Sequence, residues 1–146
     1  MPAKKANVWS DAEKAAMKEG AHERKSSAKM TPAEERAQGE ADIQAKIAGM
    51  PEPDRSLAQR IHALVTKTAP TLMPRTYYGM PAYARDGKTV CFFKPASKFK
   101  ERYSTFGFEQ NARLDDGTMW PTSYAITKLT ATDEKEIAAM VKKAVG

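Results

Sequence analysis

The sequence predicts an α+β fold, in which an antiparallel sheet of about four or five strands carries helices on one face. Apolar residues recur at helical spacing on both sides of the central region, and short β-rich runs separated by Asp-Gly turns lie between them. A helical, charged N-terminal extension is predicted over residues 1–50 and the α+β domain over residues 51–146.

Two capping patterns mark helix starts in the first fifty residues. Ser10 and Glu13 form an S-x-x-E capping box, and Thr31-Pro32 starts a second helix with proline at its first position. The segment "MPEP" at 50–53 then marks a boundary, because a residue that precedes proline is pushed out of helical conformation.

The strongest helix follows the boundary, with Leu57, Ile61 and Val65 on one apolar stripe. His62 lies beside this stripe, where a lone histidine is usually a boundary residue whose ring is hydrogen-bonded. With only one other histidine, in a polar linker, a zinc site of ordinary composition is not predicted.

The pair Asp86-Gly87 predicts a two-residue hairpin turn, since both residues tolerate positive φ. Counting back from this turn places Arg85 opposite Lys88 and Tyr83 opposite Val90. Further strands are expected within residues 102–108 and 119–129. A last helix is expected to begin near Thr132 or Asp133, with Asp133 and Glu136 as its capping box.

Composition and charge limit the classes of function. The single cysteine, Cys91, allows no intrachain disulfide, and no signal peptide or membrane span is evident, so a soluble cytoplasmic protein is expected. The net charge of +6 belongs mostly to residues 51–146, which favours anionic partners but serves solubility equally well.

The helix over 54–69, "YYGMPAY" and "GKTVCFF" resemble the YdhG-like domain, a family of small bacterial proteins mostly without assigned function. The resemblance covers roughly residues 51–146 and implies an α+β sandwich. Because one branch of the family is regarded as frataxin-like iron chaperones, it also implies intracellular iron handling as a possible activity.

The preferred site is an aromatic junction with an adjoining basic loop. Aromatic rings and a methionine around Gly79 could line a small-molecule pocket or simply close the core. The basic and aromatic residues that follow suit an anionic ligand or, as a less favoured reading, nucleotide or nucleic-acid binding; a solvated loop explains them equally well. The candidate ligand-binding residues are Tyr77, Tyr78, Met80, Tyr83, Lys94, Lys98, Lys100 and Arg102.

Two further classes of function stay open. An iron site would need carboxylates, for which Asp115, Asp116, Glu134 and Glu136 are the candidates, but turns and helix starts explain them as well. No catalytic constellation is visible, and Cys91 is expected on a packed face. We therefore expect a non-enzymatic small-ligand-binding or chaperone-like protein without a predicted cofactor, iron entering only under the iron-chaperone alternative.

Overall fold

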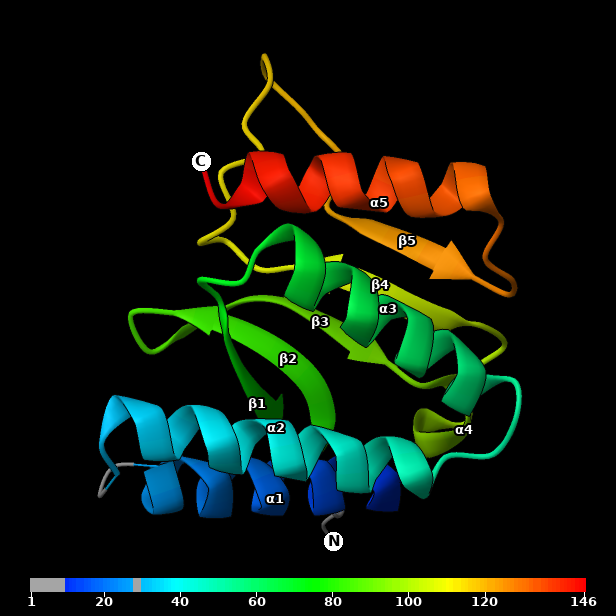
Figure 1. Ribbon diagram of the computed structural model, residues 1–146. Helices are drawn as coiled ribbons and strands as arrows, with labels where there is room; N and C mark the ends of the chain where they lie inside the picture. Colours follow the sequence, from blue (N-terminus) through cyan, green and yellow to red (C-terminus); the bar gives the residue numbers. More distant parts are fainter. Residues whose placement is uncertain (1–9, 28–29) are drawn as a thin grey trace, which may run out of the picture.

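The computed structural model describes residues 10–27 and 30–146, with the backbone alone for 22–27. Its centre is an antiparallel five-stranded sheet in which each strand pairs with the next in the chain. The strands are β1 Met73–Tyr77, β2 Met80–Arg85, β3 Lys88–Lys94, β4 Ser104–Phe108 and β5 Ser123–Ile126. The predicted α+β class is confirmed (Figure 1).

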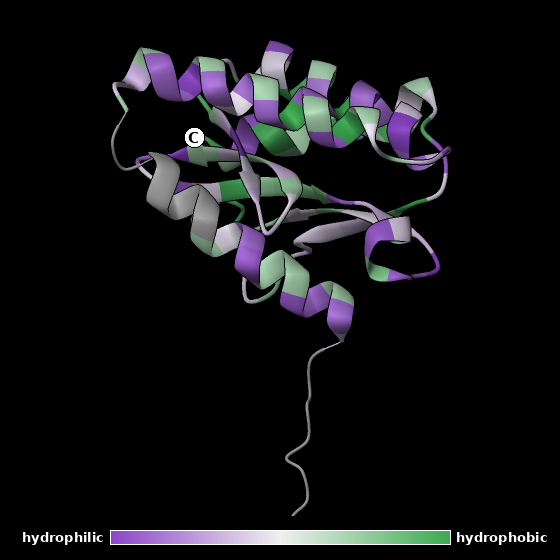
Figure 2. Cartoon of the chain, turned by 90° about the horizontal axis from the view of Figure 1, so that it is seen from below, coloured by the Kyte–Doolittle hydropathy of each residue, from purple (hydrophilic) through white to green (hydrophobic). Residues whose placement is uncertain are grey.

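Three helices cover one face of this sheet (Figure 1). They are α2 Pro32–Ala48, α3 Asp54–Thr68 and α5 Ala131–Ala144. Helix α1, Asp11–Ser27, lies on the other side of the sheet, next to β1 (Figure 2). The short α4, Ala96–Phe99, joins β3 to β4. None of the helices in the described part of the chain has the length and apolar character needed to cross a bilayer.

Helix α2 belongs to the packed body, although it falls within the predicted extension. Thr31 caps its start as predicted, and its side chain and that of Glu34 form reciprocal bonds to each other's backbone N–H. Ile43 and Ile47 are 0% and 1% exposed and join the same core as α3 and the sheet. The helix also approaches β1 closely, since a Cβ on Gly39 would stand 1.9 Å from the carbonyl oxygen of Pro74.

The core lies between the sheet and these three helices. The predicted stripe of α3 is buried there, and Cys91 is fully buried as expected. Aromatic side chains from the middle strands supply much of its volume, namely Tyr83, Phe93 and Phe106.

The β2–β3 hairpin has the predicted turn but a different register. Asp86 and Gly87 have φ of 52° and 77°, as a two-residue turn of this kind requires. Beyond Ala84, however, Tyr83 pairs with Cys91 and not with Val90, because a β-bulge inserts Val90 as an extra residue. The predicted pairing of Tyr83 is therefore wrong, and Tyr83 shares the helix-covered face with Cys91.

The β1–β2 connection repeats the same turn geometry. Tyr78 and Gly79 have φ of 52° and 77°, and Tyr77 pairs with Met80. The predicted aromatic junction is thus a tight hairpin, so neighbouring side chains along it point to opposite faces of the sheet.

The last helix begins earlier than predicted. Thr130 is its N-cap, and Asp133 closes the capping box as the third helical residue. The Asp133–Glu136 box is therefore wrong, because a threonine three residues upstream offers the hydroxyl that the same motif requires.

Candidate functional site

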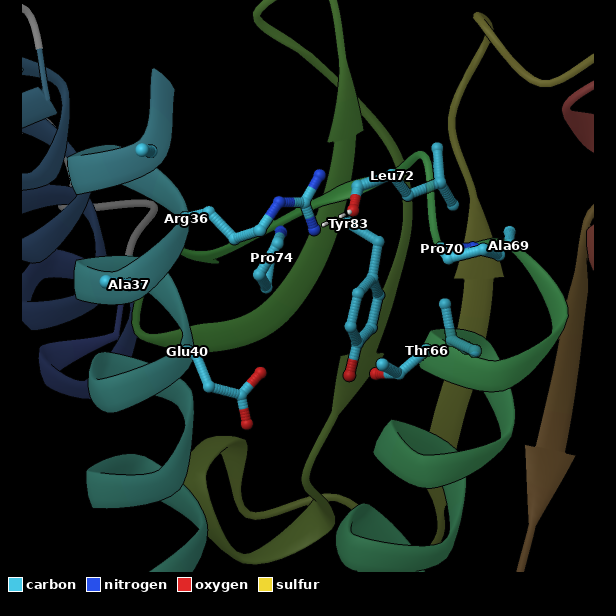
Figure 3. A pocket seen from close by; sticks show the side chains of 11 residues that line it. Arg36, Ala37, Glu40, Thr66, Ala69, Pro70, Leu72, Pro74 and Tyr83 are labelled. Carbon is cyan, nitrogen blue, oxygen red and sulfur yellow. Dashed lines mark hydrogen bonds between the residues drawn. The ribbon is translucent and has the colours of Figure 1, made fainter. Parts of the chain in front are cut away.

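A pocket of about 440 Å³ opens between α2, α3 and the chain that enters β1 (Figure 3). Tyr83 of β2 contributes to its inner wall, and one polar wall comes from α2. The apolar side chains around it are Ala33, Ala37, Val65, Ala69, Pro70, Leu72 and Pro74. A mostly apolar hollow of this size with a few polar groups is the usual form of a small-molecule site.

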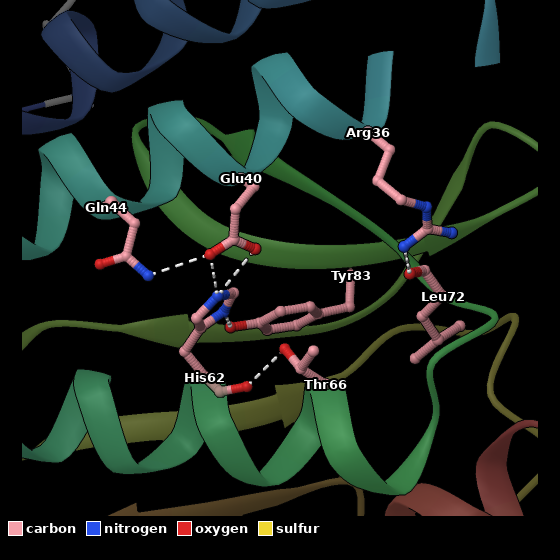
Figure 4. Close-up of polar contacts among 7 residues, drawn as sticks. All are labelled: Arg36, Glu40, Gln44, His62, Thr66, Leu72 and Tyr83. Carbon is pink, nitrogen blue, oxygen red and sulfur yellow. Dashed lines mark hydrogen bonds and ion pairs between the residues drawn. The ribbon is translucent and has the colours of Figure 1, made fainter. Parts of the chain in front are cut away.

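A hydrogen-bonded chain of three side chains lies at the inner end of the pocket (Figure 4). The Nε2 atom of His62 is 3.0 and 2.8 Å from the two carboxylate oxygens of Glu40, and its Nδ1 is 2.9 Å from the Tyr83 hydroxyl. His62 is only 7% exposed. Both ring nitrogens are therefore satisfied, as the sequence predicts for this histidine.

The protonation states of the flanking groups define the direction of these bonds. Burial alone would raise the pKa of Glu40, but hydrogen bonds from Gln44 and His62 outweigh it and the pKa is lowered. Burial, with smaller contributions from Cys91 and Glu40, holds the pKa of Tyr83 well above its ordinary value. An ionised carboxylate can only accept, so Nε2 carries a proton, and in the tautomer with this one ring proton the Nδ1 atom accepts from Tyr83.

Two more polar groups complete the pocket. The Thr66 hydroxyl donates to the backbone carbonyl of His62 at 2.7 Å. Arg36 lies one helical turn before Glu40, and its Nη1 donates to the carbonyl of Leu72 at 3.2 Å (Figures 3 and 4). The pocket therefore has a cationic group toward one end and a carboxylate toward the other.

The structure separates the four residues predicted at the aromatic junction. Tyr83 lines the pocket, and Met80 is buried at 6% exposure. Tyr77 is on the opposite face from Tyr83, with its ring 6.3 Å from that of Phe92. Tyr78 sits in the turn, 4.6 Å from the Tyr77 ring, and faces α1. Their joint role in one ligand site stays a prediction.

Lys94 at the end of β3 and Lys98 within α4 have carboxylate partners. Lys94 donates to Glu101 at 3.0 Å, and Lys98 donates to Glu19 of α1 at 2.9 Å. Both ammonium groups also lie over the Phe99 ring, at 5.0 and 5.8 Å from its centroid. These contacts tie the basic loop to itself and to α1.

The other two basic residues of the loop are exposed. Lys100 ends α4 in the left-handed conformation with φ of 55°, and Arg102 lies 5.1 Å above the Tyr103 ring. They are remote in sequence and element from the pocket-lining residues.

The four carboxylates considered for iron do not come together. Glu134 and Glu136 are at the N-terminal end of α5, whereas the loop with Asp115 and Asp116 projects beyond its C-terminal half (Figure 1). Glu134 is paired with Arg60 at 2.5 Å. Within residues 10–21 and 30–146, no three or more His, Cys, Asp or Glu side chains are grouped as a metal site.

Arg36 and Glu40 of α2 line the pocket but are not among the site residues predicted from the sequence. Arg36 and Glu40 continue the stripe of Ile43 and Ile47 toward the helix N-terminus, at helical spacing. Charged residues on the extension of an apolar stripe are a detectable signal, because that face of the helix turns toward the core.

Comparisons with protein-family models, curated proteins and solved structures found no match.

Proposed function

We propose that this chain is a non-enzymatic, small-ligand-binding protein whose ligand occupies the pocket between α2, α3 and β1. The observation that carries the proposal is the pocket itself, about 440 Å³, with apolar walls and convergent polar groups from three elements. Tyr83 is the one residue that this site shares with the aromatic junction predicted from the sequence.

Binding without catalysis is favoured by the state of the reactive side chains. The phenol of Tyr83 has a raised pKa and hydrogen-bonds to His62. Burial also raises the pKa of the Cys91 thiol, which is 0% exposed and not a lining residue of the pocket. Neither group has the lowered pKa that activates a nucleophile.

The resemblance to YdhG-like domains and a cytoplasmic location remain part of this proposal. Iron handling by the carboxylates and nucleic-acid binding by the basic loop are the alternatives that its test separates. Bound mass in native mass spectra of the purified chain would distinguish a metal from an organic ligand.

The direct test fills the pocket and compares the effect with the same change elsewhere on α2. Ala37 lines the pocket, whereas Ala45, on the same helix and also exposed, does not. We expect that small-molecule fragments detected by ligand-observed NMR bind the wild type and Ala45→Trp equally and lose binding to Ala37→Trp. Fragment binding that survives in Ala37→Trp, or no fragment binding at all, would refute the pocket as the functional site.

A further inference from the structure

The inner end of the pocket offers only hydrogen-bond acceptors to a ligand. In the tautomer of His62 that carries its proton on Nε2, the Tyr83 proton is committed to Nδ1, and the Thr66 proton is committed to the backbone carbonyl of His62. Glu40 is an ionised carboxylate and has no proton to offer. Figure 3 shows the three oxygen-bearing side chains converging on the same part of the cavity. A ligand group at this end must therefore be a donor.

The other end of the pocket offers only donors. Arg36 uses one Nη1 bond for the carbonyl of Leu72, and a guanidinium has five N–H groups and no acceptor. Arg36 and Glu40 have the i,i+4 spacing at which a helix commonly forms an ion pair, yet none joins them among the contacts of the described side chains. Neither charge is thus neutralised by the other, while Glu40 also accepts bonds from Gln44 and His62.

We infer that the pocket selects a small zwitterion, with an ammonium group held by Glu40, Thr66 and Tyr83 and a carboxylate held by Arg36. This inference rests on the proposed function and names its ligand class. Arg36 and Glu40 leave α2 about 6 Å apart along the helix axis, and their charged ends point to opposite ends of the cavity, which leaves room for a short alkyl chain between them (Figure 3). Leu72 and Pro74 supply apolar contacts for that chain.

Selectivity follows from the polar groups that the wrong ligand leaves unmatched. A molecule without the ammonium group removes water from Glu40 and supplies no hydrogen bonds in place of those that Glu40 made to that water. A molecule without the carboxylate does the same to Arg36. Sites built around hydrogen bonds to a ligand reject analogues that lack the bonding group. A zwitterion should therefore bind more tightly than either singly charged analogue.

The test uses three probes with one chain length: aminohexanoate, hexylamine and hexanoate, titrated into the full chain by calorimetry. We expect aminohexanoate to bind at least about tenfold more tightly than either analogue, which corresponds to about 1.4 kcal/mol. Glu40→Gln should remove its advantage over hexanoate, and Arg36→Gln its advantage over hexylamine. Glu35→Gln and Lys67→Gln change the same charges outside the pocket and should preserve both advantages.

A second variant guards against a folding defect in Glu40→Gln. Thr66→Val keeps the side-chain shape and leaves the bonds of His62 to Glu40 and Tyr83 in place. It should weaken aminohexanoate and hexylamine several-fold and leave hexanoate unchanged. Equal binding of the three probes, or unchanged selectivity in Glu40→Gln, Arg36→Gln and Thr66→Val, would overturn the inference. If the probes bind equally and Ala37→Trp still blocks them, the proposed function survives; if no probe or fragment binds the pocket, both fail.

Discussion

At the scale of single residues, the Tyr83 hydroxyl is the buried partner of His62. Removing it in Tyr83→Phe leaves the Nδ1 atom of a histidine that is 7% exposed without its hydrogen bond. We expect a loss of about 1–3 kcal/mol in the free energy of unfolding, because a buried polar atom then lacks a partner. Urea unfolding monitored by circular dichroism measures this.

Tyr77→Phe is the matched control for that substitution. The Tyr77 hydroxyl donates to Glu109 over a longer 3.3 Å, and Tyr77 is only partly buried on the other face of the sheet. Its removal should change the free energy of unfolding by less than about 0.5 kcal/mol. Identical unfolding midpoints for the two variants would show that the His62–Tyr83 bond contributes nothing to stability.

The satisfied ring of His62 could be predicted from the sequence, but its partners could not. Glu40 is 22 residues earlier and on a separate helix, and Tyr83 is 21 residues later. Only the packing of α2 and α3 on one face of the sheet brings them together. The bulge at Val90 also contributes, because it makes Tyr83 pair with Cys91 and not with Val90.

At the scale of elements, the contact of α2 with β1 depends on Gly39. A Cβ at this position would stand 1.9 Å from the Pro74 carbonyl oxygen, a backbone atom that cannot rotate away. We expect Gly39→Ala to lower the free energy of unfolding by about 1–3 kcal/mol or more, because the helix must move off the strand. The comparison is Gly49→Ala, whose Cβ would have its nearest neighbour at 3.7 Å with φ of −86°.

Gly49→Ala should be neutral or stabilising by about 0.4–1 kcal/mol, since alanine restricts the unfolded chain at a backbone conformation that it adopts without strain. Thermal unfolding of both variants checks the pair. A Gly39→Ala melting temperature at or above that of Gly49→Ala would contradict the close approach of α2 to β1.

Helix α1 is attached through Glu19, which contacts Lys46 of α2 and Lys98 of α4. Burial alone would raise the pKa of Glu19, but its bonds to the two lysines lower it below 4.5. The resulting stabilisation is complete above pH 4.5 and is lost as the pH falls through the folded-state pKa. Hydrogen-exchange protection of α1 should therefore fall on acidification.

The Glu19→Gln variant distinguishes the effect of this carboxylate on α1 from the effects of other carboxylates with lowered pKa values. Protection of α1 amides in this variant should already be reduced at neutral pH and should vary less with acid. Protection equal to wild type at every pH would show that the two ion pairs do not attach α1.

Element boundaries show how far local sequence signals reach. The α3 stripe, the Thr31 cap and the Asp86-Gly87 turn depend on neighbouring residues, and the sequence predicts them. Helix α5 starts upstream of the predicted position, because two capping motifs overlap there and Thr130 provides the cap. The contribution of α2 to the core depends on only two buried isoleucines and a glycine contact, which no local pattern distinguishes from a solvated helix.

At the scale of the whole molecule, the N-terminal segment contains two parts with different roles. Helix α2 buries Ile43 and Ile47 against the sheet, whereas α1 lies on the other side of the sheet and, within residues 11–21, buries only Ala16 and Gly20. We expect a chain that starts at residue 30 to stay folded and one that starts at residue 51 to lose its cooperative unfolding. Circular dichroism during heating of the two truncated chains measures this.

The shorter chain loses the side chains of Ile43, Ile47 and Met50 from the core, and each buried aliphatic side chain contributes about 1.5–3 kcal/mol. A cooperative melt at the wild-type temperature for the chain starting at residue 51 would contradict the assignment of α2 to the core.

The central claim is that the pocket between α2 and α3 binds the ligand. The most direct measurement is a heteronuclear NMR titration of the full chain with aminohexanoate, followed at assigned backbone amides. We expect the shift changes to cluster at the amides of residues that line the pocket, namely Arg36, Ala37, Glu40, Val65, Thr66 and Leu72. Changes centred on the Lys94–Arg102 loop or on the Tyr77–Met80 turn, with the α2 and α3 amides unmoved, would contradict it.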